Sequence, residues 1–180
     1  MAAIDAFLAQ PTIEVKSGLV TGYDFMQDQA DAIHAMLDTA GVSPNDRLNG
    51  NSWTAAELQA HWLDVHHDVV SLNAHFDHYR AVPCGAAERS TPPPLNLWRQ
   101  SVRGKPTLQN SIIFSVGCHS GLNMPDAQVE QHKYDFAQAL VGAGAIFVAN
   151  TGYGYATPTP SAIPSGSCSF LSSSCRLRTM

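Results

Sequence analysis

The chain has 180 residues, of which 44% are hydrophobic and 14% charged, a composition typical of one globular domain with a sizeable core. Its formal net charge of −5 argues against nucleic acid as a partner, because domains that bind nucleic acid carry a basic surface. No apolar run reaches the roughly 18 residues of a membrane span, and no basic segment precedes an apolar stretch at the N-terminus. The sequence therefore predicts neither a membrane span nor a signal peptide.

Helix-like and strand-like segments alternate along the first 150 residues. Gly41 is suited to end the second helix, and Thr54 with Glu57 forms the capping-box pattern that begins the third. Residues 83–93 predict a loop, and a short amphipathic segment follows at 95–102. The helices are expected at 2–9, 24–41, 54–63 and 129–144, and the strands at 18–23, 68–75, 111–117 and 145–150.

This alternation predicts an α/β fold with a mostly parallel sheet and helices on both faces. The apolar segments 111–117 and 145–150 are expected to be strands buried on both faces. In such sheets, ligands and catalytic groups collect at the carboxyl ends of the strands. Segment 68–75 leads into His75 and segment 111–117 leads into Cys118, so we expect both side chains at one rim if their strands are parallel neighbours.

Cys118 has three possible roles: a small core residue, a metal ligand or a nucleophile. Gly117 and Gly121 flank it and permit a sharp turn, which exposes a side chain at a strand end and frees backbone N–H groups. A cysteine nucleophile needs a base or a positive neighbour to form the thiolate, and His75 is suited to that role. No CxxC pair accompanies the four cysteines, so the sequence indicates neither a disulfide framework nor a zinc ribbon.

Metal binding is the main alternative for the same region. His75, Asp77 and His78 offer zinc-binding side chains at a strand end, and His119 is a fourth candidate. Their spacing fits no common metal motif, so we expect no metal or other cofactor. His66 and His67 are expected to be solvated at the end of a helix. A Ser-His-Asp hydrolase is less favoured, because the sequence CHSGL is not G-x-S-x-G.

Three blocks of the sequence, VVSLNAHFDHYRAVP, IIFSVGCHSGLNMPD and FAQALVGAGAIFVANTGYGY, occur in this order. Together they resemble the gingipain-type cysteine peptidases, part of the caspase-like group with clostripain and separase. The resemblance covers roughly residues 15–155. It implies a caspase-hemoglobinase α/β fold and a peptide or protein substrate, cleaved by a dyad of Cys118 as nucleophile and His75 as base.

Two features depart from the pattern of this family. The usual His-Gly is His75-Phe76 here, so the backbone N–H that often contributes to the oxyanion hole belongs to a bulkier residue. His78 is a second candidate for the base, although His75 is nearer the strand end. A non-catalytic scaffold or remnant of the family remains an alternative to an active peptidase.

The sequence changes character at residue 156. Residues 156–180 are rich in Pro, Ser and Thr without periodicity, which predicts a disordered tail after a peptidase domain at 1–155. In relatives of this block, the sequence after Tyr-Gly-Tyr resembles Gly-Asp-Thr-Asp-Thr. We write this continuation as the codons GGC GAC ACC GAC ACC ATC and delete one G. The new frame then encodes Ala-Thr-Pro-Thr-Pro, which is the sequence of residues 156–160. We therefore expect an out-of-frame tail on a domain that is incomplete at its C-terminus.

Overall fold

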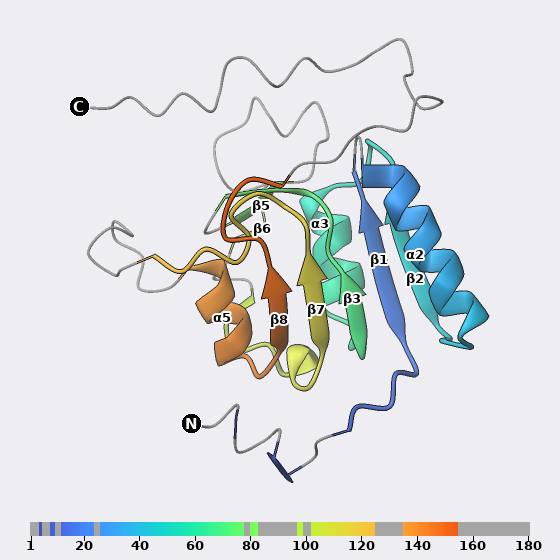
Figure 1. The fold of residues 1–180 in the computed structure, drawn as a ribbon, viewed down its shortest axis with the longest axis horizontal. Coiled ribbons are helices and arrows are strands. Elements are labelled where there is room, and N and C mark those ends of the chain that lie inside the picture. The colour runs from blue at the N-terminus through green and yellow to red at the C-terminus, as the bar shows by residue number, and fades with distance from the viewer. Residues whose placement is uncertain are drawn as a thin grey trace.

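The fold is an α/β arrangement around one parallel sheet (Figure 1). The computed structural model describes residues 4, 8–9, 12–23, 26–77, 80–82, 97–98, 102–124 and 135–154. The elements are β1 Gly18–Gly22, α2 Gln27–Thr39, β2 Asn45–Asn49, α3 Ala55–Leu58, the π-helix η2 Gln59–Leu63, β3 Val69–Ser71, β4 His75–Asp77, β5 Arg80–Val82, β6 Leu97–Trp98, the 3-10 helix η3 Pro106–Leu108, β7 Ile112–Ser115, α5 Phe136–Gly142 and β8 Ile146–Ala149.

The main sheet has five strands in the order β2-β1-β3-β7-β8, and every pairing between them is parallel. The prediction of a parallel α/β sheet is therefore confirmed. A separate antiparallel sheet of three short strands, in the order β4-β5-β6, follows the carboxyl end of β3. No described helix has the length and apolar character that a membrane crossing requires.

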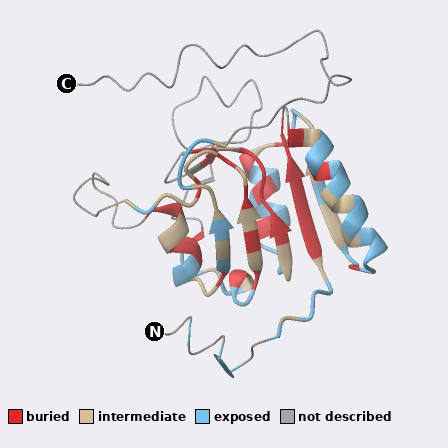
Figure 2. Cartoon of the chain, in the orientation of Figure 1, coloured by how far each residue is buried: buried red, intermediate tan, exposed pale blue. Residues whose placement is uncertain are grey.

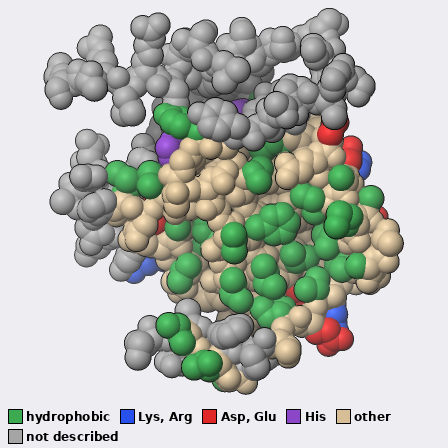
Figure 3. All heavy atoms as spheres, viewed as in Figure 1, with side chains coloured by type: hydrophobic (Ala, Val, Ile, Leu, Met, Phe, Trp, Pro, Cys, Tyr) green, Lys and Arg blue, Asp and Glu red, His purple; other side chains and the backbone are tan. Residues whose placement is uncertain are grey.

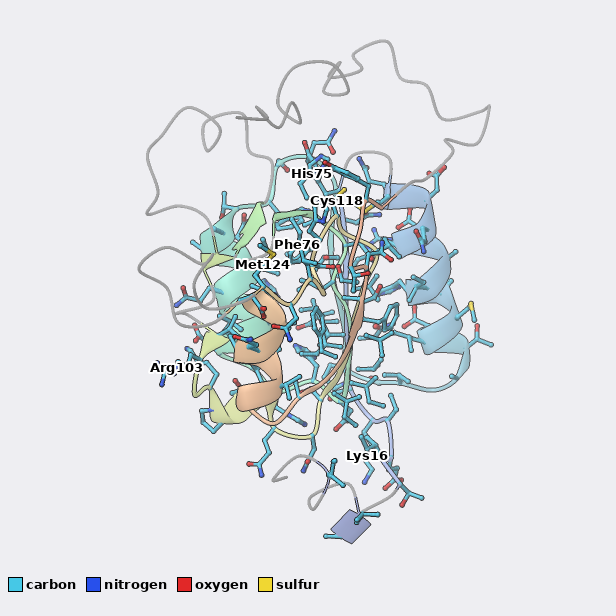
Figure 4. All side chains as sticks on the ribbon, turned by 60° about the vertical axis from the view of Figure 1, so that its left-hand side comes forward. Lys16, His75, Phe76, Arg103, Cys118 and Met124 are labelled. Carbon is cyan, nitrogen blue, oxygen red and sulfur yellow. The ribbon has the colours of Figure 1, made fainter. Side chains whose placement is uncertain are left out.

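Helices lie on both faces of the main sheet, as expected. In Figure 4, α2 lies on one side of the sheet, while α3 and α5 lie on the other. The core is concentrated on the side of α3 and α5, where Leu19, Val70 and Ile113 of neighbouring strands pack with helix residues including Trp62 and Leu140. Helix α2 approaches β1 closely, because Gly22 presents no side chain where Ala30 lies.

Strand β2 is a feature that hydropathy did not predict. Its sequence, NDRLN, is polar, yet it pairs with β1 along its whole length. Asn45, Arg47 and Asn49 alternate along it and all bond to polar groups of α2: Asn45 to the His34 carbonyl, and Arg47 and Asn49 to Asp31. A polar interface between strand and helix thus replaces the apolar alternation by which strands are usually recognised.

The local signals for the helices were largely correct. Thr54 and Glu57 form the expected capping box, and Gly41 follows α2 with a φ of 80°. The third helix changes from α to π at Gln59, which the sequence did not indicate. The expected helices at 2–9 and 129–144 fall partly outside the described residues, as does the expected loop at 83–93.

One prediction about burial was wrong. Among the residues that the structure describes, helices cover strands β7 and β8 on only one face, because α2 lies over β1 and β2 (Figure 2). Ile112 pairs with Ile146 and Phe114 with Val148, and all four side chains point to the uncovered side. Val148 is 64% exposed and Ile146 is 39% exposed. We call these four residues the open apolar face; green side chains gather on this side of the molecule in Figure 3.

Asp68 joins β1 and β3 at the amino end of the sheet. Its carboxylate accepts hydrogen bonds from the backbone N–H groups of Lys16 and Ser17, at 2.9 Å each, and from the Ser17 hydroxyl at 3.0 Å. Burial alone would raise the pKa of Asp68, but these bonds and one from His66 outweigh it and hold the pKa below its ordinary value. The carboxylate therefore stabilises the fold in its charged form.

We expect Asp68→Asn to lower the free energy of unfolding by about 1–2 kcal/mol near neutral pH, since charge-assisted hydrogen bonds are lost. A lowered folded pKa means that this stabilisation is present above the ordinary carboxyl pKa and is lost as pH falls through the folded value. The difference in urea-unfolding free energy between the two proteins should thus shrink as pH falls below the ordinary carboxyl pKa of about 4. Asp64→Asn is the control, because the Asp64–Lys105 pair is a surface contact. A constant gap at all pH values would contradict the assignment.

Candidate functional site

The carboxyl ends of the parallel strands form one rim of the sheet. Tyr23 follows β1, residues 72–74 lead from β3 into β4, Cys118 follows β7 and residues 150–154 follow β8. Because β3 and β7 are parallel neighbours, the condition for His75 and Cys118 to share this rim is met. Figure 4 shows the two residues at the same end of the sheet.

His75 does not end the strand that was expected at 68–75. Strand β3 stops at Ser71, and His75 is the first residue of β4 in the separate antiparallel sheet. Leu72 still donates to the Phe114 carbonyl of β7, the neighbour of β3, whereas the backbone N–H of Asn73 donates to the side-chain hydroxyl of Thr21 and so ends the backbone ladder.

Asn73 fixes the segment that carries His75. Its backbone N–H donates to the Thr21 hydroxyl at 2.7 Å, and its side-chain amide donates to the Thr21 carbonyl and the Ser71 hydroxyl. All three residues are at most 1% exposed. This buried polar network ties the chain before His75 to the carboxyl end of β1, so the position of His75 is set by two strands.

The side chains of His75 and Phe76 point in opposite directions, as neighbouring residues of a strand do. The imidazole of His75 packs edge-on against the ring of Tyr23, with centroids 5.0 Å apart and planes at 69°. Phe76 is buried against Phe136 of α5, with centroids 5.3 Å apart. Phe76 thus anchors β4 in the core while His75 stays half-buried at the rim.

Cys118 lies at the start of a tight turn and is half-buried. Its Sγ donates weakly to the Gly154 carbonyl at 3.8 Å. The turn is held by the segment after β8: His119 N donates to the Gly152 carbonyl at 2.7 Å, and Gly121 N to the Asn150 carbonyl at 2.8 Å. Within the described part of the chain, no acceptor lies on the backbone N–H of Cys118. That N–H group is a candidate donor to a ligand.

Gly117 brings the two candidate residues together. A Cβ atom at this position would lie 2.9 Å from the carbonyl oxygen of Ala74 and would overlap the ring of Phe76. Ala74 and Phe76 are the residues on either side of His75, and Gly117 directly precedes Cys118. The segment carrying the cysteine therefore lies so close to the segment carrying the histidine that no side chain fits between them at this point.

The alternative metal cluster is brought together only in part. His119 is occupied elsewhere: its Nδ1 lies 3.3 Å from the Thr151 carbonyl and its ring packs against Tyr153, with centroids 4.6 Å apart. His78 and the side chain of Asp77 lie outside the described residues. Among the residues that are described, no group of three or more His, Cys, Asp or Glu side chains could hold a metal ion.

Of the two neighbouring histidines expected to be solvated, His67 is buried, and that prediction was wrong. Its Nε2 lies 2.8 Å from the His61 carbonyl and its side chain has no exposed surface. His66 is partly exposed, beside Asp68 and the Thr107 carbonyl. Both lie toward the amino end of β3, away from the rim.

Sequence reasoning missed Tyr23 and Asn73 as parts of the site. The signal for Tyr23 was its position directly after an apolar strand, the same signal that identified Cys118. Asn73 was counted within a strand, although asparagine is unfavourable there.

The chain was compared with protein-family models, with curated proteins and with solved structures, and no match was found in any of the three.

We expect Gly117→Ala to disturb the site, because the added methyl group must displace the Ala74 carbonyl or the Phe76 ring. Overpacking of this kind costs about 1–3 kcal/mol of unfolding free energy, measured by urea denaturation. Gly152→Ala is the matched control: it lies on the turn beside Cys118, with no atom within 4 Å of the added Cβ. Equal stability of the two variants would show that the close approach at Gly117 is not required.

Proposed function

We propose that the chain is a cysteine-type endopeptidase domain in which Cys118 is the nucleophile and His75 the base. The observation that carries this proposal is the contact of Gly117 with Ala74 and Phe76, which sets the backbone of Cys118 against that of His75. A half-buried thiol, a half-buried imidazole and an available N–H group at one strand rim are the components of acyl transfer by a thiol.

The reaction follows from these groups. His75 accepts the thiol proton, and Cys118 Sγ attacks the carbonyl carbon of the peptide bond to form a tetrahedral intermediate. The N–H of Cys118 donates to the developing oxyanion. Collapse breaks the C–N bond as His75 protonates the leaving amine, and water, deprotonated by His75, hydrolyses the thioester and restores the thiol. The sequence resemblance to gingipain-type peptidases supports a peptide substrate.

A peptidyl chloromethyl ketone and the smaller iodoacetamide test the dyad. Both should label Cys118 near pH 7, and Cys118→Ala should abolish that label, as measured by mass spectrometry of the tryptic peptide. His75→Ala should slow the labelling about tenfold or more, because an unassisted thiol is only a few per cent thiolate at neutral pH.

His119→Ala is the matched control for the histidine, since His119 adjoins Cys118 but packs on the turn at Thr151 and Tyr153. It should leave the labelling rate within about twofold. A rate that is unchanged in His75→Ala would refute the dyad. Loss of activity in the presence of EDTA would favour the metal-dependent hydrolase instead.

We also propose the finer fold assignment, a caspase-like domain whose last elements are not encoded in frame here. The open apolar face supports it, because parallel sheets are normally covered on both faces. A helix from in-frame sequence after β8 would cover Ile146 and Val148. If no such helix covers the sheet, the second candidate is a non-catalytic remnant of the family, since an uncovered sheet favours aggregation over activity.

Restoring the frame by one inserted nucleotide at codon 156 tests this assignment. In the present chain, Val148→Thr should change the free energy of unfolding by less than about 0.5 kcal/mol, because the side chain is mainly exposed. In the restored chain it should cost about 1 kcal/mol or more, since a methyl group is then replaced by a buried hydroxyl. An equal cost in both chains would refute coverage of this face by the restored segment.

A further inference from the structure

Tyr23 provides the surface on which the imidazole of His75 rests. It directly follows β1, whereas His75 follows β3, and the two rings meet edge-on with centroids 5.0 Å apart. Tyr23 is only 2% exposed, so its ring has little freedom to move away. Contact with this fixed ring excludes the side-chain rotamers of His75 that point away from Tyr23.

The ring of Tyr23 is itself held from the other side. Trp53 packs on it at a right angle, with centroids 6.4 Å apart, and the Trp53 indole N–H donates to the Gly22 carbonyl at 3.1 Å. The Tyr23 carbonyl accepts from Met26 N at 3.0 Å. The Tyr23 ring therefore contacts both the indole of Trp53 and the imidazole of His75.

We propose that Tyr23 is a positioning residue for His75, one that orients the imidazole toward Cys118 through ring contact. This inference rests on the proposed Cys118–His75 dyad. Backbone contacts fix where the chain at His75 lies, through Asn73 and Gly117, but they leave the side-chain torsions open. Contact with the Tyr23 ring constrains these torsions, and edge-to-face aromatic pairs are worth about 0.5–1.5 kcal/mol beyond their burial.

The test measures alkylation of Cys118 by iodoacetamide near pH 6.5 and near pH 9, in the full chain. An ordinary thiol is largely deprotonated near pH 9 without a base, so the ratio of the two rates measures assistance by His75. Tyr23→Leu should lower this ratio about three- to tenfold, because the imidazole is no longer oriented. Tyr23→Phe keeps the ring and should restore the ratio to within about twofold of the wild-type value.

Leu140→Ala is the structural control, since Leu140 is equally buried in the core but belongs to α5, which packs on β8 and not on Tyr23. It should destabilise the fold but preserve the ratio. If Tyr23→Leu does not fold, Tyr23→Met takes its place, with the same expected fall. An unchanged ratio in the Tyr23→Leu or Tyr23→Met variant, an equal fall in Leu140→Ala, or no rescue by Tyr23→Phe would overturn the inference.

The failure of this inference and that of the dyad are distinguishable. If His75→Ala lowers the ratio and Tyr23→Leu does not, only the role of Tyr23 is refuted. If His75→Ala itself leaves the ratio unchanged, the dyad is refuted and the positioning role with it.

Discussion

The close approach of two chain segments at Gly117 is the constraint on which the rim depends. One segment leaves β7 and the other leaves β3, and a single Cβ atom between them would meet a carbonyl oxygen and an aromatic ring. Both segments are also tied to further strands, the first to the turn after β8 and the second to β1. Four parallel strands therefore contribute to one small region, although the residues involved are far apart in sequence.

Neighbouring residues have different roles, one packing in the core and the next lying at the rim, and this explains how a polar site forms above an apolar core. Phe76 packs on Phe136 and holds β4 down, which leaves His75 at the rim. In the same way, Ile113 of β7 enters the core, while the glycine after the strand allows the chain to turn and present Cys118. Bulky residues anchor the chain in the core, and the residues near them in sequence present the reactive side chains at the rim.

The sequence predicted most of the sheet because periodicity and caps are local signals. The segments around Leu19, Val70 and Ile113 are apolar and short, and all became strands of the parallel sheet. Strand β2 was missed because its partner is a polar face of α2, so the usual apolar alternation is absent. Parallel pairing of β3 with β7 was stated only as a condition, since register between distant segments has no local signature.

For the candidate site, too, the residues with a local sequence signal were predicted and the contacts between distant segments were not. Cys118 and His75 could be chosen because each follows an apolar segment, which is a property of the sequence alone. Tyr23 also follows an apolar segment, but its contact with His75 joins segments after β1 and β3 and depends on side-chain direction, which the sequence does not give. The burial of His67 was missed for a related reason: its acceptor, the His61 carbonyl, is supplied by the end of a π-helix that no propensity indicates.

The open apolar face has a consequence for the fate of the protein in a cell. Chaperones and proteases recognise chains that have failed to bury apolar surface, and small losses of stability change the abundance of a protein several-fold. Ile146 and Val148 expose apolar surface of this kind although their strand is folded. This liability belongs to the face of the sheet at β8, and it depends neither on unfolding nor on the thiol at the rim.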